Sequence, residues 1–336
     1  MAVPIWKDII YTLSEGVAGD TDFNVQISGN TIYAGYAYAR PDSDGYPRVR
    51  VNDILADKFK RGLTFLGMED TPAIDYTLLY DMGRSSYADT AFADWSYDPD
   101  HTPTTQGMNF PICDILLPGQ WVPGTGADPG NEGEVAFEIT QRDADGDFNL
   151  DFNSDFLVYG DSDLLSDRDQ VPFLTTEWLN LRDYPTAVKV DVYESGSAKN
   201  TVYRVGGGCK QYALYYVNAY GGWDTLAVLG NTKVRDTLKH YTTEQVYDNT
   251  QTHNRGKVNY VNEVTRAFTF NTHPLNEDQA SRMHHLLNSP HVYLHDVLTN
   301  HVYPIVLTGN TTEHSKGPGL HSYTIEAELA QTRIRR

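Results

Sequence analysis

Several features that would assign the chain to a common class of protein are scarce or missing. Its 336 residues include only two cysteines, Cys113 and Cys209, which cannot form a disulfide framework. No stretch approaches the ~20 apolar residues that a membrane-spanning helix needs, so we expect no membrane insertion. The opening MAVPIWKDIIYTL has no basic segment followed by an apolar one. We therefore expect no signal peptide and synthesis in a cytoplasm.

Motifs of common enzyme chemistry are also missing. The sequence contains no GxxxxGK[ST] loop, no GxSxG elbow and no HExxH zinc motif. Three glycines at 206–208 follow an expected strand, but no helical pattern follows them, which argues against a dinucleotide loop. We therefore expect no enzyme and no organic cofactor. Glycoside hydrolysis by a pair of carboxylates stays open as an alternative, because Asp and Glu are abundant in the middle of the chain.

The charge is strongly negative and unevenly distributed. The net charge is −19, which argues against nucleic acid as a partner, because phosphate binding needs a basic surface. Residues 85–181 hold 19 acidic residues against two basic ones, Arg142 and Arg168, and so carry −17. The remainder of the chain is close to neutral.

The composition favours a mainly β fold, of a sandwich-like or barrel-like kind, with a few short helices. Tyrosine occurs 23 times, and tyrosine is enriched in strands and at interfaces. Residues 1–84 are expected to form a β-rich domain. In it, alternation over 23–27 and 32–38 around a turn at Gly29–Asn30 predicts a hairpin. Asn52 is placed to cap a short helix.

Residues 85–181 are expected to form an acidic, loop-rich insertion, since Pro, Gly and Asp interrupt all but short apolar stretches. One stretch of this insertion, residues 143–151, is compatible either with a Ca²⁺ site looser than an EF-hand or with a solvated acidic loop. The match to an EF-hand fails, since Leu150 stands where glycine is needed and Phe156 where glutamate is needed. The acidic and amide residues that alternate there, as calcium ligands do, are Asp143, Asp145, Asp147, Asn149 and Asp151.

Residues 182–336 are expected to form a C-terminal β domain with one helix at 277–288. Asn276 is a suitable N-cap, Glu277 and Asp278 suit the positive end of the helix dipole, and Pro290 ends the helix. Strand patterns precede and follow the helix, which predicts a β-α-β-β-β order. The histidines concentrated here are expected at the surface or at interfaces.

Aromatic residues crowd both faces of the strand pattern in YALYYVNAYGGWD. Such a strand is buried on both sides, or is buried on one side and pressed against a partner on the other. An exposed platform at Tyr220 and Trp223 that stacks on sugars is a second interpretation. The candidate interface residues of this stretch are Tyr212, Tyr215, Tyr216, Tyr220 and Trp223.

The pattern of both ends of the chain resembles a known family. The ending, from TFNTHPLNEDQASRMHHLLNSPHVYLHD to HSYTIEAELA, is similar to phage tail proteins of the tail-tube and distal-tail type. The opening VPIWKDIIYT, TIYAGYAYARPD and the YALYYVNAYGGWD stretch resemble uncharacterised structural proteins of phages that infect gut Bacteroidales. The resemblance covers about the first 80 and the last 140 residues and omits the acidic middle.

The resemblance implies a virion subunit, made in the host cytoplasm, that forms a homo-oligomeric ring at the tail tip or baseplate. Such a subunit would bridge the tube to hub or receptor-binding proteins. The basic end, Arg333, Arg335 and Arg336, is a candidate to pair with the acidic segment of an adjacent copy. A carbohydrate-binding or adhesin-like module and a glycoside hydrolase are the alternative functions.

Overall fold

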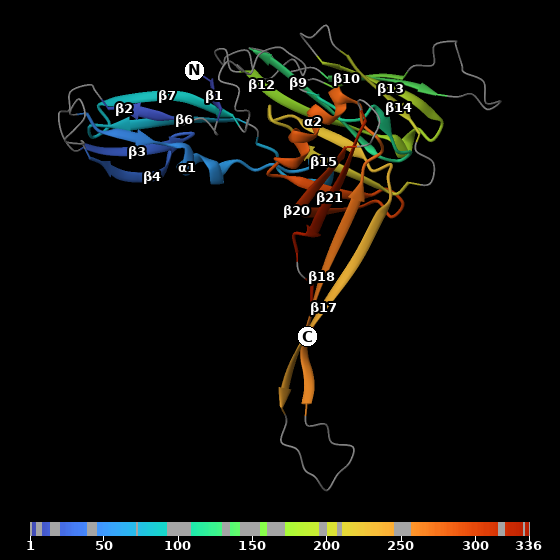
Figure 1. Cartoon of the computed structure of the whole chain (residues 1–336). Coiled ribbons are helices and arrows are strands. Elements are labelled where there is room, and N and C mark those ends of the chain that lie inside the picture. Colours follow the sequence, from blue (N-terminus) through green and yellow to red (C-terminus); the bar gives the residue numbers. More distant parts are fainter. Residues whose placement is uncertain are drawn as a thin grey trace.

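The computed structural model describes residues 2–4, 9–13, 21–38, 46–71, 73–92, 109–129, 135–141, 155–159, 172–194, 200–206, 210–244, 257–314, 320–331 and 333–335. Over these ranges the protein is mainly β, with two short α-helices and several sheets (Figure 1). The predicted mainly β fold with a few short helices is confirmed, and the described sheets do not close into the barrel-like form that the sequence left open. No helix in the described ranges is long and apolar enough to cross a membrane.

A five-stranded sheet of order β1-β7-β6-β3-β4 forms the N-terminal unit. Alternate side chains of β3 and β6, such as Val25 and Leu78, are fully buried, as expected for strands with one face on a core. A short strand pair and a helical turn contribute Val49 and Leu55 to the same core. The elements are β1 (Ala2–Pro4), β2 (Ile10–Thr12), β3 (Thr21–Ile27), β4 (Asn30–Ala37), β5 (Arg48–Arg50), α1 (Asn52–Leu55), η1 (Ala56–Lys58), η2 (Thr64–Leu66), β6 (Ala73–Tyr80) and β7 (Ser85–Phe92).

Two local details of this unit differ from the expectation. The β3–β4 hairpin is present, but its turn lies one residue earlier, at Ser28–Gly29, where both residues have positive φ (49° and 77°). Such a backbone suits the twist of a two-residue hairpin. Asn52 does not cap α1, because its side-chain oxygen accepts a hydrogen bond of 2.6 Å from the backbone N–H of Ile9. It thereby joins α1 to the segment before β2.

The middle of the chain forms a second five-stranded sheet, of order β11-β10-β13-β14-β8, and a separate pair, β9 and β12. Gly124 lets β9 lie directly on this sheet, since a Cβ there would come within 2.4 Å of Val135 Cγ1 and 2.9 Å of Phe137 Cζ. The elements are β8 (Ile115–Leu116), β9 (Trp121–Pro129), β10 (Val135–Gln141), β11 (Asp155–Tyr159), β12 (Pro172–Asn180), η3 (Leu181–Asp183), β13 (Ala187–Glu194) and β14 (Asn200–Val205).

The observed strands do not support the unit boundaries expected after residues 84 and 181. β7 starts at Ser85 and pairs with β6 along its whole length, so a boundary after residue 84 would divide a hairpin. β13 and β14 belong to the sheet of β10, so a boundary after residue 181 would divide that sheet. Residues 85–181 therefore contribute strands to three sheets and are not only loops.

The C-terminal sheet has eight strands, in the order β16-β15-β19-β20-β21-β18-β17, with β22 on β18. The succession β18-α2-β19-β20-β21 confirms the expected β-α-β-β-β order. Asn276 and Gln279 form a reciprocal capping box at the start of α2, as the N-cap assignment predicted. The elements are β15 (Tyr212–Val217), β16 (Trp223–Ala227), β17 (Thr232–Glu244), β18 (Lys257–Asn271), α2 (Glu277–Leu287), β19 (Val292–Asp296), β20 (His301–His314), β21 (His321–Leu329) and β22 (Arg333–Arg335).

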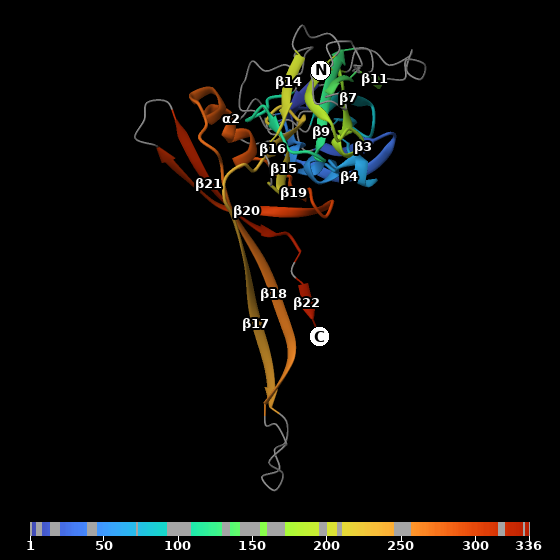
Figure 2. The same cartoon turned by 90° about the vertical axis from the view of Figure 1, so that its right-hand side faces the viewer.

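The hairpin of β17 and β18 extends far from the body of the molecule in both views (Figures 1 and 2). Its base is anchored in the core, where Phe268 and Phe270 of β18 are 5% and 1% exposed. We call residues 233–244 and 257–266, which continue beyond this base, the arm.

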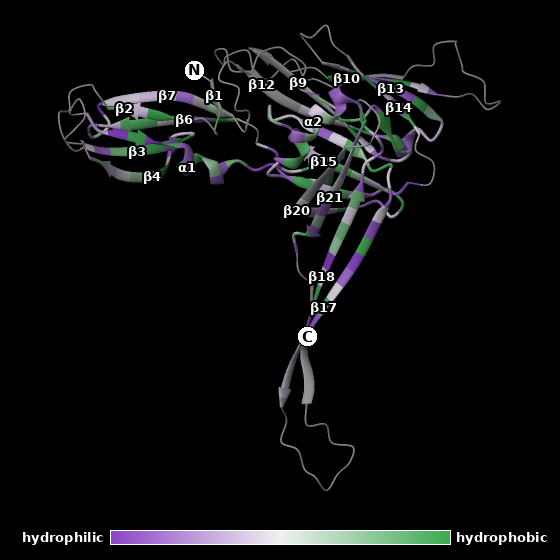
Figure 3. Cartoon of the chain, viewed as in Figure 1, coloured by the Kyte–Doolittle hydropathy of each residue, from purple (hydrophilic) through white to green (hydrophobic). Residues whose placement is uncertain are grey.

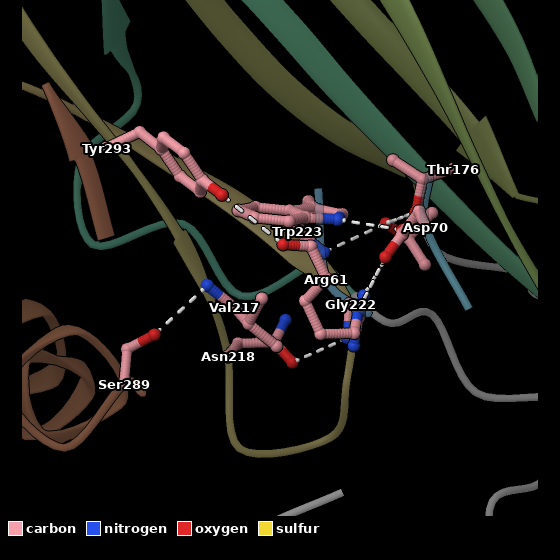
Figure 4. Close-up of polar contacts among 10 residues, drawn as sticks. Arg61, Asp70, Thr176, Val217, Asn218, Gly222, Trp223, Ser289 and Tyr293 are labelled. Carbon is pink, nitrogen blue, oxygen red and sulfur yellow. Dashed lines mark hydrogen bonds and ion pairs between the residues drawn. The ribbon is translucent and has the colours of Figure 1, made fainter. Parts of the chain in front are cut away.

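A buried ion pair fastens the N-terminal unit to the C-terminal sheet (Figure 4). Arg61 Nε donates to Asp70 Oδ1 over 2.6 Å, and the two side chains are only 2% and 7% exposed. The indole N–H of Trp223 donates to the other carboxylate oxygen over 3.0 Å. The Arg61 guanidinium also lies 5.6 Å from the Trp223 ring, and the Tyr293 hydroxyl donates to the Arg61 carbonyl.

Aromatic rings from all three units surround this ion pair. Phe65, from the segment after Arg61, stacks on Trp121 of β9 at a centroid distance of 4.3 Å. Edge-on contacts join Phe65 to Trp178 and Tyr215, which lie on β12 and β15. We call the whole set the aromatic junction: Arg61, Leu63, Phe65, Asp70, Trp121, Trp178, Tyr215, Trp223 and Tyr293.

Replacing Asp70 by Ala should destabilise the protein by about 3–5 kcal/mol, because it leaves the Arg61 charge buried without its partner. Urea unfolding followed by tryptophan fluorescence measures this loss. Glu69→Ala is the matched control, since Glu69 pairs with Lys60 at the surface, where such pairs contribute ~0–1 kcal/mol. Equal losses in the two variants would contradict a structural role for the buried pair.

Asp224 of β16 is a second buried carboxylate, and it holds the segment that enters β8. It accepts hydrogen bonds from the backbone N–H of Phe110 at 3.1 Å and from Asn218 Nδ2 at 2.8 Å. Burial raises the pKa of Asp224 to about 7. The folded protein therefore keeps a proton between pH ~4 and ~7 that the unfolded chain releases, so this group's contribution to stability falls as pH rises through that window.

Asp224→Asn should consequently gain stability relative to the wild type as the pH rises from 5 to 7, by up to about 1.4 kcal/mol per pH unit. Urea unfolding of both proteins at pH 5, 6 and 7 gives this difference. The buried histidines are present in both proteins, so their contribution to the pH dependence of stability cancels in the comparison. A difference in unfolding free energy between the two proteins that does not change with pH would contradict the raised pKa of Asp224.

Candidate assembly surface

The sequence of the arm favours a long two-stranded ribbon. Both strands are rich in Val, Thr and Tyr and contain neither Gly nor Pro, so nothing in them ends the strand early. The register runs without interruption from Thr232, opposite Phe270, to Tyr241, where a bulge shifts it. Because paired residues share a face, the ribbon has two distinct surfaces.

The first surface combines apolar residues with an ion pair. Val234 and Leu238 are 48% and 55% exposed. Between them, Arg266 holds the Asp236 carboxylate through two hydrogen bonds of 2.7 and 2.8 Å. Figure 3 shows hydrophobic and hydrophilic residues interspersed along both strands of the arm. The arm thus presents apolar side chains that its own chain leaves largely uncovered.

The second surface is mainly basic. Lys233, Arg235 and Lys239 alternate along β17 and therefore project to one side. Tyr241 lies on the same side, is 44% exposed and donates its hydroxyl to Glu263 over 2.9 Å. Every residue from Lys233 to Thr243 is exposed, and β17 is an end strand of its sheet. Such a strand offers both its side chains and its backbone edge to a partner.

The structure brings the C-terminal arginines to the arm. β22 pairs with β18, with Arg333 opposite Val264 and Arg335 opposite Asn262. Arg336 lies outside the described residues. In the sequence, residues 232–271 together with the three terminal arginines hold nine basic and four acidic residues. The arm is thus a positive segment of a chain whose net charge is −19.

Three of the five aromatic residues expected at an interface instead lie in the interior of the chain. Tyr215, Tyr216 and Trp223 are all fully buried. Trp223 therefore cannot serve as an exposed platform for sugars. Tyr212 and Tyr220 are partly exposed, and Tyr220 packs against Phe110 and His285. Alternation along a strand does not distinguish a core that other segments complete from a surface that another subunit completes.

Two histidines expected at the surface are also part of the core. His295 is 0% exposed and its Nδ1 lies 2.8 Å from the Tyr215 hydroxyl. His285 Nδ1 accepts from the backbone N–H of Ala219 over 3.1 Å. Burial lowers the pKa of His285 to about 3 and that of His295 to about 4. Both side chains are therefore neutral at physiological pH and serve to position the chain.

The candidate calcium residues, Asp143, Asp145, Asp147, Asn149 and Asp151, lie outside the described residues. Within the described ranges, no group of three His, Cys, Asp or Glu side chains is arranged to hold a metal ion. The Ca²⁺ site stays a prediction from the sequence.

Comparisons with known proteins give little further information. No family model matches the chain, and no curated protein matches it. Among solved structures, a chain from a structure described as the tail of an empty GTA particle, with C6 symmetry, is similar over 33% of this chain and 87% of its own length. The identity is 11% and the TM-score is 0.24, too low to define the fold.

The exposed apolar residues of the arm were not identified from the sequence, although the alternation in TKVRDTLKHYTTE was the available signal. Leu238→Ser should change the free energy of unfolding of the isolated protein by no more than about 0.5 kcal/mol, as for other exposed sites. Urea unfolding tests this expectation. A loss above about 2 kcal/mol would mean that Leu238 is packed within its own chain.

Proposed function

We propose that this protein is a structural subunit of a bacteriophage tail, located near the distal tail or baseplate. In this proposal it forms a ring with copies of itself, contacts hub or receptor-binding proteins, and has no catalytic role. The resemblance of both ends of the sequence to tail proteins supports this function. The arm is the structural observation that carries the proposal.

An isolated two-stranded ribbon is at best marginally stable in water, and the arm extends well beyond the sheets that hold its base. It nevertheless carries exposed Val234, Leu238 and Tyr241. Covering these side chains would add the hydrophobic stabilisation that the free arm lacks, at about 25 cal/mol per Å² of buried apolar surface. Such an arm is expected in a subunit of an assembly, where a second subunit covers its apolar side chains, and not in a protein that functions alone.

The distribution of charge supports contact between copies of the same chain. Residues 85–181 carry −17, while the arm and the terminal arginines are basic. Opposite charges on different segments of one chain favour head-to-tail contacts. A head-to-tail contact between identical subunits generates a closed ring or an open stack, according to its rotation.

The double variant Val234→Ser/Leu238→Ser should shift the purified protein from oligomer to monomer, because it removes the apolar contact of the arm. Light scattering and negative-stain images of the same sample measure the outcome. Leu298→Ser is the matched control, since Leu298 is also an exposed leucine (70%) but lies in the turn between β19 and β20. Loss of assembly in the control alone, or in neither variant, would contradict the proposal.

Removing residues 333–336 should make assembly less sensitive to salt, because the deletion removes three arginines, two of which lie on β22 beside β18 of the arm. Individual exposed ion pairs contribute only ~0–1 kcal/mol, so we expect the deletion to weaken assembly without abolishing it. Light scattering from 50 mM to 500 mM salt gives the comparison. An unchanged salt dependence would remove the terminal arginines from the interface.

A further inference from the structure

The N-terminal sheet ends in a strand whose outer edge has no partner strand among the described residues. β4 closes the order β1-β7-β6-β3-β4, and β3 is the described strand that pairs with it (Figure 1). End strands of soluble proteins commonly carry lysine, proline or an inward-facing charge, which discourages pairing with a further strand. β4 has the sequence NTIYAGYA and contains no proline and no charged residue. Past a register shift opposite Val25 and Gln26, residues 33–37 pair with β3 without interruption. The outer edge of β4 is therefore suited to strand addition.

A groove of about 540 Å³ lies beside this edge. Its walls are β4 and the segment formed by β5, α1 and η1. Apolar side chains from both walls line it, with Ile32 and Tyr33 on β4 and Val49 and Ile54 on the other wall. Because side chains alternate along a strand, a strand added to β4 would direct every second side chain into this space.

The two faces of β4 differ in chemistry. Tyr33 lies opposite the buried Val25 and so shares the core face of the sheet, yet it is 46% exposed. Tyr36 lies opposite Asp22 on the other face, is 70% exposed and also contributes to the lining of the groove. Ala34, two residues before Tyr36, shares this second face. An added strand would thus meet an apolar face on the core side and, on the other side, a tyrosine beside a carboxylate.

β17 of the arm has two faces that match those of β4. Val234 and Leu238, which are 48% and 55% exposed, lie on one face. Lys233, Arg235 and Lys239 lie on the other. β17 is also an end strand without glycine or proline, so its backbone edge can pair with a further strand.

Pairing β17 with β4 brings both sets of faces together. With Val234 and Leu238 towards the groove, the basic face of β17 lies beside Tyr36 and Asp22. A cation over an exposed tyrosine ring and a cation near a carboxylate are both favourable contacts. The charge of the strand and the chemistry of the groove therefore agree on one orientation.

Two other pairings of these edges match less well. Two β4 strands paired with each other would form an isologous dimer and leave Val234 and Leu238 uncovered. Two β17 strands paired with each other would place basic side chains beside basic side chains, which is destabilising. Figures 1 and 2 show the arm projecting away from the N-terminal unit of the same chain, so an arm on β4 comes from another copy.

We propose that the arm docks by strand addition, in which the outer edge of β17 in one copy pairs with the outer edge of β4 in another copy. In this contact Val234 and Leu238 lie in the groove beside Tyr33, and the basic side chains of β17 lie beside Tyr36. The inference rests on the proposed assembly function and identifies the surface that receives the arm. Because the two surfaces differ, the contact continues from copy to copy around a ring or along a stack.

Photo-crosslinking from the receiving strand of the full-length chain tests this docking site. A p-benzoylphenylalanine in place of Tyr36 keeps an aromatic ring at that position. We expect mass spectrometry to map its intermolecular products to residues 232–244 of a second chain. Products that map to residues 30–38 of a second chain would indicate paired β4 strands and would overturn the inference. Products that map elsewhere, or only to the same chain, would overturn it as well.

A charge placed at the exposed Ala34 gives an independent test with a matched control. Ala34→Lys should weaken assembly about tenfold or more, because the new cation opposes the basic face of β17. Ala34→Glu changes the same exposed position and should assemble at least as tightly as the wild type. Lys233→Glu/Lys239→Glu in the Ala34→Lys background should restore assembly. Light scattering over a dilution series measures each variant, and equal assembly of all of them would overturn the inference.

Failure of this inference is distinguishable from failure of the proposed function. Wild-type oligomers that the Ala34 variants leave unchanged, with products from position 36 outside residues 232–244, would place the arm on another surface and leave the assembly function standing. A wild-type protein that stays monomeric at every concentration would overturn the proposed assembly and this inference with it.

Discussion

The attachment of the N-terminal unit to the C-terminal sheet depends on one buried ion pair. Arg61 and Asp70 lie on the segment between η1 and β6 of the N-terminal unit, and Trp223 binds the pair from the C-terminal sheet. A buried charge is tolerated only where a partner neutralises it, so each of these groups requires the others in place. The aromatic rings around the pair come from all three units. The relative position of the units is thus set by polar contacts of defined geometry inside an apolar shell, and not by apolar burial alone.

Separation along the chain explains which parts of the structure the sequence could predict. The helix at Glu277–Leu287 is a local feature, and its capping residues and amphipathic pattern lie within about a dozen positions. The β3–β4 hairpin is equally local. By contrast, β10 pairs with β13 about 50 residues away, and β8 pairs with β14 about 90 residues away. Pairings of this kind depend on tertiary packing, which alternation within a short stretch does not encode.

For the candidate surfaces too, alternation within a strand does not show which segment, if any, covers its side chains. Tyr215 and Trp223 have the pattern of an interface, but Phe65 and Arg61, about 150 residues earlier in the chain, cover them. The alternation in the arm is typical of any strand. The structure adds that the arm projects from the body and that Val234 and Leu238 stay about half exposed. The sequence predicts part of the positive charge near the arm, because the terminal arginines are candidates for contact with the acidic segment of an adjacent copy.

The central claim is that the arm of one copy lies on another copy of the chain. A photo-crosslinking residue placed at position 238, followed by mass spectrometry of the products, tests it most directly. The account predicts crosslinked dimers in which position 238 is joined to a second chain, in lower yield at high salt. Crosslinks confined to the same chain, or none to a second copy at concentrations where oligomers form, would contradict it.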